Sequence, residues 1–139
     1  MGDEAISAER LQRREQLNGL SEIVLDAAIT IHKAFGSGLL ESAYQRALVI
    51  ELRERGLSVR AEVPVEARWR GKPLGNAFFA DVLVDNRLLI ELKAVREVTN
   101  VHRAQARTYL KLLDYRLGLL INFHALRLID GYERIVNDF

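Results

Sequence analysis

The fold of this chain is decided by residues 78–94, which read FFADVLVDNRLLIELKA. Two apolar runs, 78–84 and 88–94, flank the polar turn 85–87 and predict a pair of β-strands joined by a hairpin loop. Because side chains alternate along a strand, Glu91 and Lys93 project together from one face of the second strand. An acid and a base thus share an apolar strand, where unpaired charges are costly.

The length of the turn determines which carboxylates meet. With a three-residue loop, Val84 pairs with Leu88, and Asp81 lies directly across from Glu91 with Cβ atoms about 5 Å apart. A two-residue loop would put the two acids on opposite faces of the sheet. Two carboxylates this close repel unless a proton or a cation lies between them, and oxygen ligands of this kind suit Mg²⁺ or Mn²⁺. Lys93, on the same face, can orient water or stabilise charge on a phosphate oxygen.

The sequence before these strands has the period of helices. Residues 3–17 are charged and loosely periodic, which predicts a surface helix or arm that ends at Asn18-Gly19. Apolar residues then recur at helical spacing over 20–35, with Ser21 as the expected N-cap and Gly36-Ser37-Gly38 as the stop. A second amphipathic helix is predicted over 39–55. We therefore expect an N-terminal helical arm over residues 1–19 and one domain over residues 20–139.

The other elements alternate between strand and helix periods. Apolar and polar residues alternate over 57–69, which predicts a strand that Pro64 breaks or confines to a sheet edge. Asn100 is expected to cap a helix over 101–113, with an apolar stripe of Val101, Ala104, Tyr109 and Leu112. The run 115–123 is typical of a buried strand, and 126–129 with 132–136 could close the sheet. The pattern indicates an α/β fold.

Amino-acid composition limits the kinds of metal site and binding partner that this chain can have. A chain of 139 residues is long enough to form one domain without covalent cross-links. It has no cysteine, so any metal must be held by oxygen or imidazole ligands. Twenty basic and nineteen acidic residues give a net charge of +1, which leaves nucleic-acid binding to a local patch. No signal peptide or membrane span is predicted, and we expect a cytoplasmic protein.

A further motif opens the second helix, where Gly38-Leu39-Leu40-Glu41-Ser42-Ala43-Tyr44 reads G-x-x-E-x-x-Y. Together with Phe79-Ala80-Asp81 and Ile90 to Ala94, it resembles the GxxExxY family of the PD-(D/E)XK nuclease superfamily, over residues 20–137. The resemblance implies a restriction-endonuclease-like (PD-(D/E)XK) core, a mixed β-sheet flanked by α-helices. It implies metal ligands at Asp81, Glu91, the Leu92 carbonyl and Glu41, a catalytic Lys93, and an auxiliary Gln105 and Tyr109. Phe79 departs from the pattern, because a basic residue is expected there.

These residues support the hypothesis of metal-dependent phosphodiester hydrolysis. Asp81 and Glu91 would hold one or two Mg²⁺ or Mn²⁺ ions, and Glu41 would add a ligand directly or through water. Lys93 would position the attacking water or stabilise the oxyanion. DNA is favoured over RNA by analogy with the superfamily. Arg103, Arg107 and Lys111 recur every four residues on one side of the helix 101–113, where such a row could track phosphates.

Several alternatives stay open. The acids could form an exposed ion-pair cluster, and Glu41 could simply stabilise a helix N-terminus. The fold could be a non-catalytic module that binds nucleic acid or protein, or an enzyme that acts only as a homodimer or with a partner subunit. Tyr44 is expected in the core, where it would orient the Glu41 carboxylate. Trp69 is expected to pack rather than to stack on bases, His32 to lie on a helix surface, and His102 is a candidate substrate contact.

Overall fold

The computed structural model describes residues 6–75 and 78–139. Its elements are α1 (Ala8–Phe35), α2 (Glu41–Glu54), β1 (Val59–Pro64), β2 (Arg68–Trp69), β3 (Lys72–Pro73), β4 (Phe79–Val84), β5 (Leu88–Lys93), α3 (Asn100–Leu113), β6 (Leu117–Asn122), the 3₁₀ helix η1 (Leu128–Gly131) and β7 (Tyr132–Val136). None of the described helices has both the length and the apolar character needed to cross a membrane.

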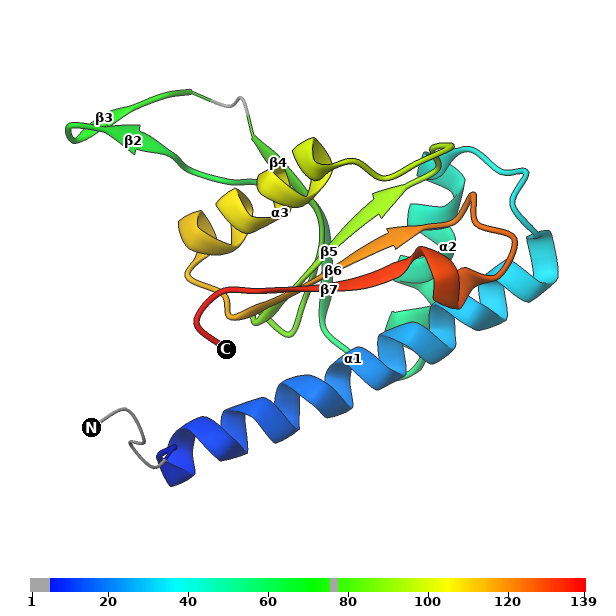
Figure 1. The fold of residues 1–139 in the computed structure, drawn as a ribbon, viewed down its shortest axis with the longest axis horizontal. Coiled ribbons are helices and arrows are strands. Elements are labelled where there is room, and N and C mark those ends of the chain that lie inside the picture. The colour runs from blue at the N-terminus through cyan, green and yellow to red at the C-terminus, as the bar shows by residue number, and fades with distance from the viewer. Residues whose placement is uncertain (1–5, 76–77) are drawn as a thin grey trace.

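The core is a five-stranded mixed sheet with the strand order β1-β4-β5-β6-β7 (Figure 1). Only β5 and β6 are parallel among these neighbours, and α3 makes the crossover that a parallel pair requires. Helices α1 and α2 pack on one face of the sheet, and α3 packs on the other. The predicted mixed sheet flanked by helices is confirmed.

The first helix is longer than the sequence predicted. Helix α1 runs from Ala8 to Phe35 with Ser7 as its N-cap, so the predicted break at Asn18-Gly19 is wrong. Ser21 is not a cap either, because it is buried within the helix, where its hydroxyl donates to the Asn18 carbonyl at 2.8 Å. Leu17 and Leu20 are both buried in the core. Burial of a leucine is worth about 1.5–3 kcal/mol, which outweighs the cost of about 1 kcal/mol for Gly19 in a helix.

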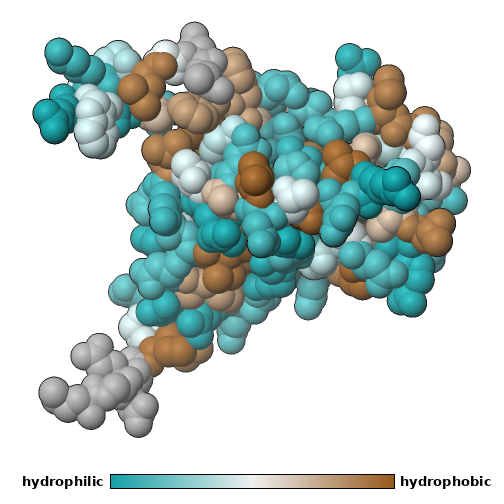
Figure 2. All heavy atoms as spheres, turned by 45° about the horizontal axis from the view of Figure 1, so that its top comes forward, coloured by the Kyte–Doolittle hydropathy of each residue, from teal (hydrophilic) through white to brown (hydrophobic). Residues whose placement is uncertain are grey.

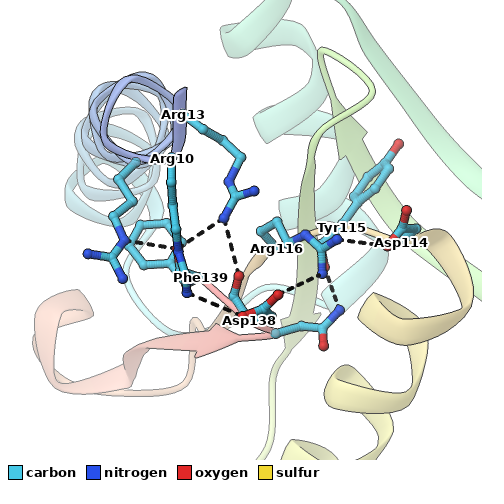
Figure 3. A network of polar contacts seen from close by, with 9 residues as sticks. Arg10, Arg13, Asp114, Tyr115, Arg116, Asp138 and Phe139 are labelled. Atoms are coloured by element: carbon cyan, nitrogen blue, oxygen red, sulfur yellow. Dashed lines mark hydrogen bonds and ion pairs between the residues drawn. The ribbon is translucent and has the colours of Figure 1, made fainter. Parts of the chain in front are cut away.

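Arginines near the start of α1 bind the end of the chain (Figure 3). Arg10, Arg13 and Arg14 each donate a hydrogen bond to the main-chain oxygen of Phe139, at 3.3, 3.1 and 2.9 Å. Arg14 and Arg134 also place their guanidinium groups over the Phe139 ring, each 5.4 Å from the centroid. These contacts fix the charged first turns of α1 beside the segment that follows β7.

The face that α3 buries differs from the predicted stripe. Ala106, Tyr109 and Leu110 are buried, whereas Val101 is 76% exposed and both Ala104 and Leu112 are exposed. Leu110 packs over Gly118 of β6, where an added Cβ would lie 3.3 Å from the Leu110 side chain. The N-cap is also one residue earlier than predicted, because Thr99 caps the helix in a capping box with His102.

Four smaller predictions on the elements are resolved by the sheet and its connections. Strand β1 is an edge strand that ends at Pro64, as predicted, whereas 126–129 leads into η1 rather than forming a strand. His32 is buried, with Nε2 2.8 Å from the Ala125 carbonyl, so its predicted place on a helix surface is wrong. Trp69 is 66% exposed on the β2–β3 hairpin, so its predicted packing role is also wrong.

Candidate active site

The register of the β4–β5 hairpin brings two carboxylates together. Val84 pairs with Leu88 and Val82 with Ile90, so the loop has three residues, as predicted, and the next position outward sets Asp81 opposite Glu91. Asp85 and Asn86 have φ values of 51° and 54°, in the left-handed region that Asp and Asn tolerate in tight turns. Asp81 Oδ2 accepts a hydrogen bond from the Leu92 amide at 2.9 Å, which fixes this carboxylate beside the Glu91 strand position.

Glu91 is the buried member of the pair. It is 4% exposed, and its Oε1 has no hydrogen-bond partner among the described residues. Burial, followed by the negative charge of Asp81, raises the pKa of Glu91 to about 9, although Lys93 opposes the shift. Without a cation, the carboxyl therefore keeps its proton at neutral pH. A bound cation would supply the positive charge that Glu91 lacks and would contact its Oε1 atom, which has no partner within the described residues.

Glu41 reaches the same end of β5 from the first turn of α2. Burial and then the charge of Asp81 raise the pKa of Glu41, while Lys93 and the Ala94 main-chain amide lower it. Glu41 and Asp81 also line the same cavity. Helix α2 lacks a side-chain N-cap, so Glu41 is also the first-turn acid that favours the helix N-terminus.

Tyr44 holds the first turn of α2 in place by hydrogen bonds to the loop that precedes this helix. Its hydroxyl donates to the Gly36 carbonyl at 2.5 Å and accepts from the Leu39 amide at 3.0 Å, and its ring stacks on Phe123 with centroids 4.3 Å apart. The predicted core location is confirmed. The predicted direct orientation of the Glu41 carboxylate is wrong, because the hydroxyl is used by the loop backbone.

A cavity of about 400 Å³ opens beside these acids, with walls formed by residues of α2, β1, β4 and β5: Leu40, Glu41, Ser42, Gln45, Glu62, Asp81 and Leu92. Gln45 and Glu62 are functional candidates that the sequence did not single out. Gln45 Nε2 donates to Glu62 Oε1 at 2.8 Å and to the Asp81 main-chain oxygen at 2.9 Å. The amide therefore ties α2 to both strands that border the cavity.

Glu62 has an unusual backbone conformation for a strand residue. Its φ is 53°, in the left-handed region that costs a non-glycine residue roughly 1–2 kcal/mol. The flanking pairs Ala61–Val82 and Val63–Ala80 set Glu62 opposite Asp81. The only sequence signal was the alternation of residues 57–69, which presented Glu62 as an ordinary polar position. The strained conformation instead directs attention to it as part of the site.

The sequence profile of the PD-(D/E)XK nuclease superfamily matches residues 18–135 of this chain. The chain belongs to the PD-(D/E)XK nuclease superfamily. No curated protein and no solved structure gave a match. Nucleases of this superfamily generally use divalent metal ions such as Mg²⁺, and the matched range includes all the candidate site residues described above.

The candidate acids of this PD-(D/E)XK chain form a pair rather than a closed side-chain cluster. Among residues 6–75 and 78–139, no three His, Asp or Glu side chains are close enough together to hold one metal ion. Glu41 is thus not a third member of the Asp81–Glu91 pair in this arrangement, and further ligands would come from main-chain oxygen or water. The donor type still fits a divalent ion, because the buried Glu91 Oε1 has no other partner.

Helix α3 packs on the sheet face opposite to α1 and α2, with Tyr109 on its buried side. Tyr109 is buried, and its pKa is raised by burial and then by the charges of Glu91 and Asp81. Gln105, one turn earlier, is exposed. The sequence grouped the two residues, and in the structure Tyr109 is buried whereas Gln105 is exposed.

The basic residues Arg103, Arg107 and Lys111 on α3 differ in their surroundings. The Arg103 Nε donates to both carboxylate oxygens of Glu133 at 2.9 Å, which neutralises this member of the row. Arg103 also lines a separate cavity of about 440 Å³ that contains neither Asp81 nor Glu91. Arg107 and Lys111 are exposed. His102 accepts a hydrogen bond from the Thr99 amide through Nδ1, so its observed role is that of a helix cap.

Proposed function

We propose that this protein is a metal-dependent nuclease that hydrolyses phosphodiester bonds. The observation that supports the proposal is the buried Glu91 carboxyl beside Asp81, with an oxygen that has no hydrogen-bond partner among the described residues. A purely structural ion pair would not leave such a group unsatisfied, because an orphaned buried acceptor costs about 1–3 kcal/mol. Membership of the superfamily supports the same reaction class.

In this proposal Asp81, Glu91 and the Leu92 carbonyl would hold Mg²⁺ or Mn²⁺, with Glu41 contributing through water. When bound, the ion supplies an activated water and neutralises developing phosphate charge. Lys93 projects from the same face of β5 as Glu91, where its ammonium group would stabilise a phosphate oxygen or position the water. Gln45 would act as a positioning residue, because it holds the main chain of Asp81 and the Glu62 carboxylate.

DNA is the proposed substrate, in preference to RNA, by analogy with the superfamily. Gln105 and Tyr109 would contact the substrate or the acids from α3, and Arg107 and Lys111 would follow its phosphates. Arg103 is a weaker candidate for phosphate binding because of its contact with Glu133. The residues Gly38, Glu41 and Tyr44 support the finer assignment to the GxxExxY group.

Metal binding is tested by calorimetry with Mn²⁺ and by a crystal soaked in Mn²⁺. We expect one strong site that Asp81→Asn and Glu91→Gln each abolish, with anomalous density at about 2.0–2.4 Å from their oxygens. Glu54→Gln, at the exposed far end of α2, is the matched control and should bind as the native protein does. Anomalous density elsewhere would contradict the proposed ligands.

Catalysis is tested with single-stranded, duplex and branched DNA and RNA in the presence of Mg²⁺ or Mn²⁺. Lys93→Met should reduce cleavage by orders of magnitude while metal affinity changes little, because a group that acts in the transition state affects turnover. Lys33→Met, an exposed lysine of α1, is the matched control. Equal cleavage by all variants would indicate a contaminating nuclease. Binding without cleavage by the native protein would favour the non-catalytic module, and activity gained only on adding another subunit would favour a partner-dependent enzyme.

A further inference from the structure

A short hairpin projects from the body of the molecule between β1 and β4 (Figures 1 and 2). Strands β2 and β3 form their own two-stranded sheet, in which Trp69 pairs with Lys72. The turn is Arg70-Gly71, with φ values of 50° and 78°, and two left-handed residues are the mark of the tight type I′ hairpin. The Leu74 amide donates to the Ala67 carbonyl at 2.9 Å and closes the base. We call residues 66–74 the hairpin arm.

The base of the hairpin arm is anchored in the core on the α3 side of the sheet. Val65 and Ala67 are buried, and Val65 packs in the same apolar cluster as Tyr109. The Val65 amide also donates to the Phe78 carbonyl at 2.9 Å. Because the base is buried and paired, the arm extends in a defined direction rather than as a loose loop.

The tip of the hairpin arm exposes an aromatic ring beside positive charges. Trp69 is the one tryptophan of the chain, and it is 66% exposed although burial of such a ring is strongly favourable. The Arg70 guanidinium lies over its ring, 5.5 Å from the centroid. Arg68 is paired with Glu66 at 2.6 Å, whereas Arg70 and Lys72 have no acidic partner within the described residues. The arm therefore offers a π-face and two cations to solvent.

The hairpin arm leaves the sheet next to the acids. It departs at the Pro64–Phe79 pair, two residues from Glu62 on one strand and two from Asp81 on the other. Trp69 is seven positions after Glu62, so at about 3.3 Å per residue the Trp69 backbone lies within roughly 23 Å of Glu62 at the cavity. Phe79 is 44% exposed and lies at the base of the arm, two residues before Asp81 on β4.

We propose that the hairpin arm holds a single-stranded segment of nucleic acid next to the cleavage position, with an unpaired base stacked on Trp69 and its phosphates contacted by Arg70 and Lys72. Stacking on an aromatic side chain is the usual way in which a protein binds unpaired bases, and neighbouring cations neutralise the backbone. A duplex buries its base faces against each other, which makes the exposed indole a poor fit to it. The substrate class rests on the proposed nuclease function, but binding by the arm can be measured without cleavage.

The fluorescence of Trp69 gives a direct test because no other tryptophan contributes. We would titrate the native protein with a ten-nucleotide oligothymidylate and with a ten-base-pair duplex, in EDTA so that no metal-dependent cleavage occurs. The single strand should quench Trp69 saturably and more strongly than the duplex. Anisotropy of a labelled oligothymidylate should show affinity falling about 5- to 100-fold in Trp69→Ala, the range for the loss of one stacking contact, and less in Trp69→Phe. Leu126→Ala, at another exposed apolar residue, is the control and should bind as the native protein does.

Lys72→Ala and Arg70→Ala should each reduce the salt dependence of binding, because each removes about one phosphate contact. Circular dichroism of Trp69→Ala establishes that the exposed residue is not needed for folding. Equal quenching by duplex and single strand, or native affinity in Trp69→Ala, overturns the arm proposal. If the native protein cleaves nucleic acid but Trp69→Ala binds it with native affinity, only the arm proposal fails. If the single strand quenches Trp69 but the protein cleaves no substrate, the arm proposal stands and the nuclease proposal fails.

Discussion

Replacing Glu91 with glutamine is expected to stabilise the metal-free protein at neutral and alkaline pH. Glu91 is 4% exposed, and burial beside Asp81 raises its pKa from near 4.5 to about 9. Between these pH values the folded protein keeps the proton while the unfolded chain has lost it. The free energy of unfolding therefore falls as pH rises from about 5 to 9, because the folded state binds more protons there. Glutamine has nearly the same shape and cannot ionise, so the unfolding free energy of the variant does not fall in this way as pH rises.

The size of the effect follows from the distance between the two pKa values. At pH 7 the native protein has lost about 3 kcal/mol to this proton uptake, since one pKa unit is worth about 1.4 kcal/mol. We expect Glu91→Gln to be more stable than the native protein by about 4–5 kcal/mol at pH 8 and nearly equal to it at pH 4.5. Urea unfolding followed by circular dichroism in EDTA at both pH values measures the difference. Glu54→Gln, an exposed acid, should show no such pH dependence.

Added Mn²⁺ should narrow the difference in stability between the two proteins. An ion at 100 times its dissociation constant stabilises the folded state by about 2.7 kcal/mol, and only the native protein has the Glu91 ligand. If native protein and Glu91→Gln keep a constant difference from pH 4.5 to 8, the buried, protonated Glu91 and the site built on it are wrong.

Three further changes test the surrounding structure. Gly19→Ala should raise the unfolding free energy by about 0.5–1 kcal/mol in urea unfolding, because Gly19 lies inside continuous α1 with no atom near an added Cβ; a decrease would indicate a helix break there. Tyr44→Phe should lower it by about 1–3 kcal/mol through the loss of two hydrogen bonds to the loop before α2, and an unchanged value would show that these bonds do not form. Gln45→Ala should weaken Mn²⁺ binding about 10- to 100-fold in calorimetry by releasing Asp81, with Gln45→Glu failing to restore it for lack of the donor; native affinity would remove Gln45 from the site.

The local part of the site could be predicted from the sequence because it depends on one hairpin. Strand period and turn length are local properties, and together they set Asp81 opposite Glu91, as the register confirms. The apolar character of residues 115–123 likewise predicted a buried strand, which is β6. The G-x-x-E-x-x-Y motif directed attention to Glu41, and α2 brings it to the same end of β5.

Other features depend on contacts between distant segments, which no local pattern contains. Continuous α1 follows from burial of Leu17 and Leu20, and on α3 the buried Leu110 packs over Gly118 of β6. Gln45 and Glu62 enter the site only because α2 packs across the sheet edge, and local alternation gave Glu62 no distinction.

Trp69 shows most plainly what tertiary structure decides. Its place in the alternation predicted a buried ring, but β1 ends at Pro64 and the chain turns away into the hairpin arm. Sequence alone determined the strand period, the turn chemistry and the Asp81–Glu91 pairing, because these depend on neighbours a few residues away. Burial of Glu91, exposure of Trp69 and the convergence of α2, β4 and β5 were decided by the packed fold, because solvent access depends on what every other segment covers.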